Sequence, residues 1–290
     1  MNKSNAWLRM MRMSNAPTIV SNITVGAALA YQVNQDSYGV RHFIFILIAV
    51  FLVYFAGMIL NDAWDANRDL VERPKRPIPQ GLISKTQAWL AGFSMLGIAI
   101  AIGIIPLHHT VATYSIPLLI IVMLTYTFLH RWMIPAILLM GICRGLIYIV
   151  VCLMFWVTNL PTQLIPFSIS LAMYTAVLTY IGRSETNKKT KHAFVTWFLM
   201  IPPLYFAITQ WDSFGIAWIP FLAMASWVFL AWRNFLPTQN KPIQGMHRLL
   251  SGFCLLDCVF LASIDEFNIM FISVGCFFLT VVLHRKILGT

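Results

Sequence analysis

The chain has 290 residues, of which 59% are hydrophobic and only 10% are charged, and its mean hydropathy is +0.75. A water-soluble domain cannot bury so large a share of apolar surface, so the composition excludes a soluble fold and indicates an integral membrane protein. Backbone groups in lipid must pair internally, so long continuous apolar runs predict helices rather than a barrel. We therefore expect an all-α, polytopic transmembrane helical bundle that forms one domain over residues 1–290.

Ten apolar stretches approach or reach the ~20 residues that a membrane-spanning helix needs. They cover residues 17–33, 42–60, 87–106, 111–129, 134–157, 164–182, 193–210, 214–232, 247–263 and 267–284. The ninth is short and contains Asp257, so nine or ten spans are expected. Two glycine pairs, Gly92 and Gly97 or Gly141 and Gly145, are candidates for close contact between helices, and the second has the Gly-x-x-x-Gly packing spacing.

The net charge of +10 does not indicate a nucleic-acid partner, because its distribution follows membrane topology. With ten spans and a cytoplasmic N-terminus, every Lys and Arg falls on the cytoplasmic side except Arg41, on the far side, and Arg144, within a span. We therefore expect both termini in the cytoplasm. No cleavable signal peptide is recognisable, and we expect a bacterial inner membrane, with an archaeal membrane as the alternative.

An acidic motif directly follows the second apolar stretch. Asp62, Asp65 and Asp69 are spaced at i, i+3 and i+7, and Asn61 lies four residues before Asp65, so a helix would gather all four side chains on one face. Clustered carboxylates repel one another, and a divalent cation relieves that repulsion. Oxygen-only ligands in small number favour Mg²⁺, which keeps positions for water and substrate phosphates. The alternative is a solvated acidic helix end near the membrane surface.

Basic residues follow the acids closely, and three prolines between Pro74 and Pro79 end the helix and stiffen the loop. The basic residues are Arg68, Arg73, Lys75 and Arg76. Acids that could hold a metal beside bases that could hold phosphate predict a site for a metal-chelated diphosphate on the cytoplasmic side. The same bases also serve as cytoplasmic topology signals.

The motif closely resembles the first signature of the UbiA superfamily of intramembrane prenyltransferases. The matching residues are Asn61-Asp62-x-x-Asp65-x-x-x-Asp69 and Glu72-Arg73-Pro74-x-Arg76-Pro77-Ile78-Pro79-x-Gly81. The resemblance implies a UbiA-like fold and an isoprenyl diphosphate bound through Mg²⁺. It also implies a site role for Tyr126, because a tyrosine and a basic pair precede the fifth span in the family. Arg131, in that pair, is either a phosphate ligand or a topology residue.

Two polar residues lie inside predicted spans. Asn22 either makes a hydrogen bond between helices or lines a cavity. Arg144 is costly at membrane depth unless it faces protein, water or an anion. It either pairs with a structural partner such as Asp257 or lies in the substrate pocket.

The end of the sixth span departs from the family. The resemblance places a second acidic motif after Tyr180, but only Glu185 remains there among bases such as Arg183 and Lys188. Glu185 either holds a metal alone, with Arg183 and Lys188 neutralising phosphate, or belongs to an inactive second site. Tyr180 is a predicted substrate contact by the same resemblance.

The sequence thus favours an integral-membrane prenyltransferase in the bilayer. It would use Mg²⁺ to move an isoprenyl group from its diphosphate to an apolar acceptor, and the resemblance implies an aromatic one, as in quinone or related lipid biosynthesis. Predicted metal ligands and catalytic residues are Asp62, Asp65, Asp69 and Glu185, and predicted substrate contacts are Asn22, Asn61, Arg68, Arg73, Arg76, Tyr126, Arg131, Arg144, Tyr180, Arg183 and Lys188. A non-catalytic prenyl-lipid-binding or scaffold protein is the first alternative, and a transporter or channel is the second.

Overall fold

The computed structural model describes residues 2–33, 40–104, 110–155, 157, 159–185, 193–211, 214–239 and 241–286, and these contain helices and no strands. For residues 104, 110, 111, 185 and 286 only the backbone is described. The elements are α1 Lys3–Met10, η1 Met13–Asn15, α2 Ala16–Val33, α3 Val40–Glu72, α4 Lys85–Ile104, α5 Thr110–Thr113, α6 Ser115–Leu129, α7 Met133–Met154, α8 Leu164–Glu185, η2 Ala193–Met200, α9 Ile201–Thr209, η3 Gly215–Ala217, α10 Trp218–Phe235, α11 Pro242–Ser263 and α12 Phe267–Lys286. The predicted all-α fold is confirmed.

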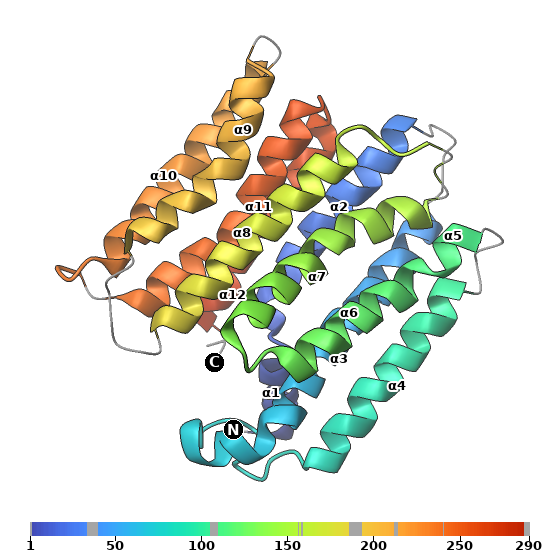
Figure 1. Cartoon of the computed structure of the whole chain (residues 1–290), viewed down its shortest axis with the longest axis vertical. Coiled ribbons are helices and arrows are strands. Elements are labelled where there is room, and N and C mark those ends of the chain that lie inside the picture. Colours follow the sequence, from blue (N-terminus) through green and yellow to red (C-terminus); the bar gives the residue numbers. More distant parts are fainter. Residues whose placement is uncertain are drawn as a thin grey trace.

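Each of the ten apolar stretches coincides with a helix or a pair of consecutive helices. Seven helices among the described residues are long and apolar enough to cross a membrane, while Ser115–Leu129 and Ala193–Thr209 are apolar but shorter. The number of spans therefore stays a prediction. The long helices lie side by side, and both termini lie at one end of the bundle, near the α3–α4 connection (Figure 1).

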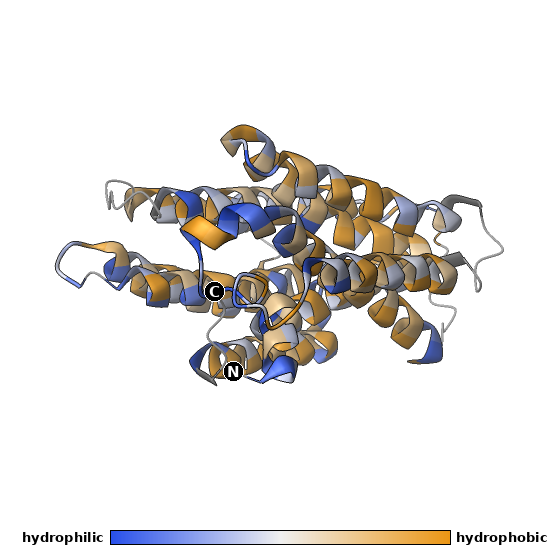
Figure 2. Ribbon diagram, turned by 90° about the horizontal axis from the view of Figure 1, so that it is seen from below, coloured by the Kyte–Doolittle hydropathy of each residue, from blue (hydrophilic) through white to orange (hydrophobic). Residues whose placement is uncertain are grey.

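Large apolar side chains cover much of the exposed helical surface. Leu90, Ile121, Ile134, Ile208 and Ile219 are each more than 60% exposed. Exposed apolar surface on this scale is stable in lipid rather than in water. Figure 2 views the end that carries both termini and shows hydrophilic segments there among predominantly hydrophobic helices. The chain is thus an integral, multi-pass membrane protein.

Helix α2 has a central position, because it packs against α7, α11 and α12. A buried carboxylate, Asp257 on α11, joins these elements. Ser21 and Tyr148 donate hydrogen bonds to it, and the Asn22 amide donates at 2.8 and 3.1 Å. Of the two roles considered for Asn22, the structure supports the hydrogen bond between helices.

Among the described residues, Arg144 forms no direct ion pair with Asp257, which takes its hydrogen bonds from α2 and Tyr148. Arg144 instead donates to the Thr18 hydroxyl, and its guanidinium lies 4.4 Å from the centre of the Phe253 ring. A desolvated aromatic face stabilises a guanidinium without a carboxylate partner.

Small residues allow α7 and α8 to approach closely, as predicted. A Cβ atom on Gly141 would lie 2.7 Å from the Ala172 carbonyl oxygen, and one on Gly145 would lie 2.5 Å from that of Ser168. Only glycine fits at either position without a shift of the helices.

Helix α3 has 33 residues and would extend about 50 Å, beyond the ~30 Å hydrocarbon core, so its last turns can project from the membrane. The chain then forms turns through residues 74–83 before α4 begins. Gly81 adopts a φ of 71° in this loop, a value that favours glycine. Ser84 and Gln87 cap α4 reciprocally, each side chain accepting from the other's backbone N–H at 3.1 Å.

Candidate active site

The acidic motif occupies the last three turns of α3, where its members divide into two sets. Asn61, Asp65 and Asp69, spaced four residues apart, line one cavity. Asp62 is equally buried but does not line the cavity wall, because one helical step rotates it by about 100°. The structure therefore brings the predicted cluster together but separates Asp62 from the residues that face the cavity.

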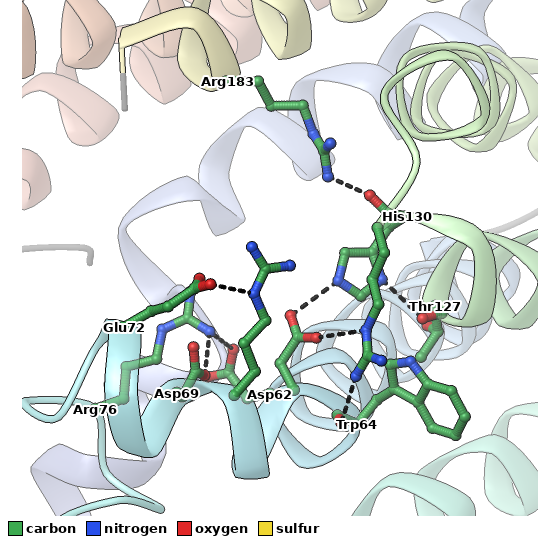
Figure 3. Close-up of polar contacts among 11 residues, drawn as sticks. Asp62, Trp64, Asp69, Glu72, Arg76, Thr127, His130 and Arg183 are labelled. Carbon is green, nitrogen blue, oxygen red and sulfur yellow. Dashed lines mark hydrogen bonds and ion pairs between the residues drawn. The ribbon is translucent and has the colours of Figure 1, made fainter. Parts of the chain in front are cut away.

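Arg76 reaches back from the loop to this helix. Its Nη1 lies 2.7 Å from Asp69 Oδ2 and 3.1 Å from Asp62 Oδ1, and the side chain is 5% exposed (Figure 3). This guanidinium offsets the repulsion between the two carboxylates, which the sequence analysis assigned to a metal. The predicted phosphate ligand Arg76 is thus already bound to the acids.

Asp65 meets a second basic group on the α6–α7 connection. His130 Nε2 lies 2.8 Å from Asp65 Oδ2, and His130 Nδ1 lies 2.7 Å from the Thr127 carbonyl oxygen. The carbonyl oxygen and the carboxylate can only accept, so each of these two contacts needs a hydrogen on the ring nitrogen that makes it. Arg131 Nε lies 3.6 Å from Asp65 Oδ1, and its guanidinium lies 5.4 Å from the centre of the Trp64 ring.

The cavity has a volume of about 680 Å³ and is formed by side chains from the η1 region, α2, α3, α6, α7, α8, α11 and α12. Seven arginines line it, against three carboxylates. Arg68 pairs with Glu72 at 2.7 Å, with both side chains about half exposed. Among the described residues, no carboxylate forms an ion pair with Arg12, Arg73 or Arg144, so these three remain available to an anionic ligand.

Arg12 joins the site through an unusual backbone conformation. It adopts φ 49° and ψ 49°, the left-handed region that non-glycine residues rarely occupy, between α1 and η1. The Tyr54 hydroxyl donates to its carbonyl oxygen at 3.3 Å, and Tyr54 itself lines the cavity. Strained backbone of this kind persists where surrounding contacts hold it, and functional sites are enriched in it.

Helix α8 forms another part of the cavity wall. Arg183 lines the cavity and donates a hydrogen bond to the His130 carbonyl oxygen, reaching across from the opposite side of the site (Figure 3). Tyr180 is not among the lining residues and packs against the hydrophobic core, so its substrate contact stays a prediction. Lys188 and the side chain of Glu185 lie outside the described residues.

Some of the other predicted substrate contacts line the cavity and one does not. Arg68, Arg73, Tyr126, Arg131 and Arg144 all line the cavity. Asn22 does not, since it is fully buried against Asp257. Sequence reasoning missed the site positions of Arg12, His130, His247 and His284. The adjacency of His130 to the predicted Arg131 was the one available signal; His247 and His284 carry no motif.

The oxygen donors fit Mg²⁺ in kind. Asn61 Oδ1 and Asp65 Oδ1 are buried without a hydrogen-bond partner, one helical turn apart on the cavity wall. Such orphaned oxygens are costly unless something binds them. Within the described residues, no group of three or more His, Cys, Asp or Glu side chains forms a ready metal site, because the aspartates are held by Arg76, His130 and Arg131.

The fold and the cavity define the class of this molecule: an α-helical integral membrane protein with a cavity between its helices that acids and arginines line. Within that class, the chain belongs to the UbiA prenyltransferase family, whose model matches residues 19–264. The resemblance stated from the motif is thereby confirmed.

Several relatives are digeranylgeranylglyceryl phosphate synthases. That of Methanoregula boonei is 32% identical over 108 residues, covering 37% of this chain and 38% of the relative. That of Thermococcus sibiricus is 43% identical over 58 residues, covering 20% and 21%. The matched stretches thus span less than half of these relatives. They are archaeal and lend no support to a bacterial inner membrane.

Solved structures share the fold at low sequence identity. A UbiA homolog from Archaeoglobus fulgidus superposes with a TM-score of 0.55 and 14% identity, covering 91% of this chain and 99% of that one. The structure of a UbiA homolog from the same organism bound to GPP and Mg²⁺ gives 0.52 and 14% over the same shares. A structure described for digeranylgeranylglyceryl phosphate synthase gives 0.54 and 15%, covering 97% and 99%.

Proposed function

We propose that this protein is a prenyltransferase that moves an isoprenyl group from a Mg²⁺-chelated prenyl diphosphate to a lipid-soluble acceptor. One observation carries the proposal: the row Asn61, Asp65 and Asp69 faces the same cavity as a surplus of arginines. Hard oxygen donors beside unpaired guanidinium groups suit a metal-bound diphosphate. The family and the names of the relatives support the reaction class.

Asp65 and Asp69, with Asn61, would hold Mg²⁺, and Asp62 would act through Arg76. When bound, the metal neutralises charge on the diphosphate and stabilises it as a leaving group. Arg68, Arg73 and Arg131 line the cavity that Asp65 and Asp69 line, and they would bind the remaining phosphate oxygens. Asp62 would keep hold of Arg76, whose guanidinium would turn from Asp69 toward the diphosphate once a cation occupies the Asp69 carboxylate.

Departure of the diphosphate would leave an allylic carbocation, which water destroys. The site lies among membrane helices, and its deeper wall is apolar, with Met58, Met140, Leu178 and Leu250. Exclusion of water by these side chains would preserve the cation until the acceptor attacks. Tyr126, on the same wall, would present its aromatic face to the cation.

The acceptor was expected to be apolar and aromatic. The relatives' names instead point to a glyceryl phosphate lipid, and the surplus of arginines in the cavity favours an acceptor with an anionic end on an apolar body. Arg12 and Arg144, which lack carboxylate partners among the described residues, would bind that end. The expected aromatic acceptor of the quinone type has no support among these relatives.

At the second acidic motif, Glu185 would hold a metal ion alone, and Arg183 and Lys188 would neutralise phosphate. The protein would lie in the cytoplasmic membrane with the site and both termini facing the cytoplasm, as the distribution of Lys and Arg predicts.

The test uses membranes that contain the protein, labelled geranyl and longer prenyl diphosphates, Mg²⁺, and a panel of glyceryl phosphate lipids and aromatic quinone precursors. Asp65→Asn and Asp69→Asn are compared with Asp265→Asn, an exposed turn residue at the α11–α12 connection. We expect Mg²⁺-dependent labelled lipid that both motif variants lose and the control retains. Equal yield from the motif variants would refute the mechanism.

A non-catalytic prenyl-lipid-binding or scaffold role is the alternative, and the depleted second motif favours it. It predicts Mg²⁺-dependent binding of the prenyl diphosphate without any labelled lipid across the whole acceptor panel. The same assay therefore separates the two functions.

A further inference from the structure

Two histidines form a stacked pair on the cavity wall, away from the acidic motif. His247 on α11 and His284 on α12 have ring centres 4.5 Å apart and ring planes inclined by only 4°. Both line the cavity that holds Asn61, Asp65 and Asp69. The scheme proposed above for the diphosphate uses neither ring.

The pair is held in place from the N-terminal region. His284 is 5% exposed, and its Nε2 lies 2.7 Å from Asn15 Oδ1 in η1. With the amide oxygen accepting, Nε2 carries the proton, so Nδ1 is the basic nitrogen of this ring. That Nδ1 is buried and has no hydrogen-bond partner among the described residues.

His247 is the more accessible of the two rings. Within the described part of the chain, no hydrogen bond to it is present, and its contact is the stack on His284. Protonation of one ring opposes protonation of the other, because like charges at this separation repel. The histidine pair therefore includes a ring nitrogen that can accept a proton.

The surroundings of the pair suit the apolar body of a lipid. Ile243, Met246, Leu250 and Phe253 lie on the same helix as His247 and line the cavity with it. The carboxylates of the acidic motif are held by cations instead: Asp69 by Arg76, and Asp65 by His130. An acceptor on the α11 wall would thus meet the imidazoles as its nearest uncommitted bases.

We infer that His247 accepts the proton which the acceptor loses during prenyl transfer, and that His284, fixed by Asn15, is the positioning residue that orients it. This inference rests on the proposed function. The donor's C1–O bond breaks and its electron pair leaves with the diphosphate; the acceptor forms a bond to that carbon; its displaced proton moves to the ring nitrogen of His247. No oxidant or reductant is needed.

The test compares His247→Ala, His247→Gln and His284→Gln with His42→Gln in the same membranes. His42 lies at the opposite end of α3, where its Nε2 is 2.8 Å from the Met154 carbonyl oxygen, and it does not line the cavity. Two readouts are taken: Mg²⁺-dependent binding of geranyl diphosphate and the rate of labelled-lipid formation. Added imidazole is then tested for rescue of His247→Ala.

General-base catalysis contributes about 10²–10⁴-fold, so lipid formation by both His247 variants should fall by that factor while geranyl diphosphate binding stays within about twofold. Imidazole should restore part of the rate in His247→Ala but none in His247→Gln, whose side chain fills the space. His284→Gln should lower the rate less. His42→Gln should match the unchanged chain.

Unchanged turnover in His247→Gln, or lost turnover without any rescue of His247→Ala by imidazole, would overturn the proton-acceptor role and leave the prenyl transfer standing. Failure of the unchanged chain to bind geranyl diphosphate or form lipid would instead refute the proposed function. The two failures are therefore distinct.

Discussion

At the scale of single residues, the acidic motif shows that adjacent carboxylates do different things. Asp62 and Asp65 are both buried, yet only Asp65 faces the cavity. Asp62 instead shares the Arg76 guanidinium with Asp69. Asp65, which would bind the metal directly, and Asp62, which holds the Arg76 guanidinium, should therefore respond differently to replacement by asparagine.

Asp62→Asn should therefore weaken Mg²⁺-dependent binding of geranyl diphosphate by roughly 10- to 100-fold, as losses of outer-sphere partners do. Asp65→Asn should abolish measurable binding. Isothermal titration of the purified protein in detergent, with and without Mg²⁺, measures both. Equal losses from the two variants would show that Asp62 also binds the metal directly.

At the scale of elements, hydrogen bonds to one buried carboxylate join three helices. Asp257 on α11 accepts from Ser21 and Asn22 on α2 and from Tyr148 on α7. The chain brings these residues together from positions more than 100 residues apart. Because α2 packs against α7, α11 and α12, this network helps to fix the part of the cavity wall that carries Thr18 and the η1 residues.

Asp257→Ala should destabilise the protein by roughly 1–3 kcal/mol for each buried donor left unsatisfied. Asp257→Asn keeps acceptor capacity and should cost less. Thermal unfolding in detergent gives the comparison. A melting temperature unchanged by Asp257→Ala would show that the network contributes nothing to the bundle.

The α7–α8 contact makes a second prediction at this scale. Gly145→Ala would place a Cβ within 2.5 Å of the Ser168 carbonyl oxygen, so the helices must move apart at a cost of about 1–3 kcal/mol. Gly97→Ala in α4 is the matched control, because nothing lies within 4 Å of its added Cβ. The control should be neutral or stabilising in the same unfolding measurement, and loss of stability there would undermine the reasoning.

At the scale of the whole molecule, the bundle separates a polar end from an apolar surround. The termini and the C-terminal end of α3 gather at one end of the bundle, where hydrophilic segments also lie (Figures 1 and 2). On the positive-inside rule, we propose that this end faces the cytoplasm.

Single cysteines in a cysteine-free background test this orientation. Lys241→Cys, in the α10–α11 connection, should react with a membrane-impermeant maleimide only when the cytoplasmic face is accessible. Thr162→Cys, an exposed residue in the α7–α8 connection, should react only from the other face. The reverse labelling pattern would invert the proposed topology.

The sequence by itself determines the class of fold and one face of the acidic helix. Composition and apolar runs determined that the chain is a membrane helical bundle, because lipid admits no unpaired backbone and helices satisfy it locally. Helical periodicity likewise placed Asn61, Asp65 and Asp69 on one face, but it also put Asp62 there, which the structure leaves out of the cavity wall.

Only the tertiary structure decided what completes the site. In the folded chain Arg76 binds the aspartates, and Asn22 donates to Asp257 instead of lining the cavity. Tyr180 does not line the cavity either. Four residues without a predicted site role do line it: Arg12, His130, His247 and His284. These contacts join residues up to 269 positions apart, as between Asn15 and His284. Local periodicity holds no information on such pairs, because they depend on how helices pack rather than on how each helix forms.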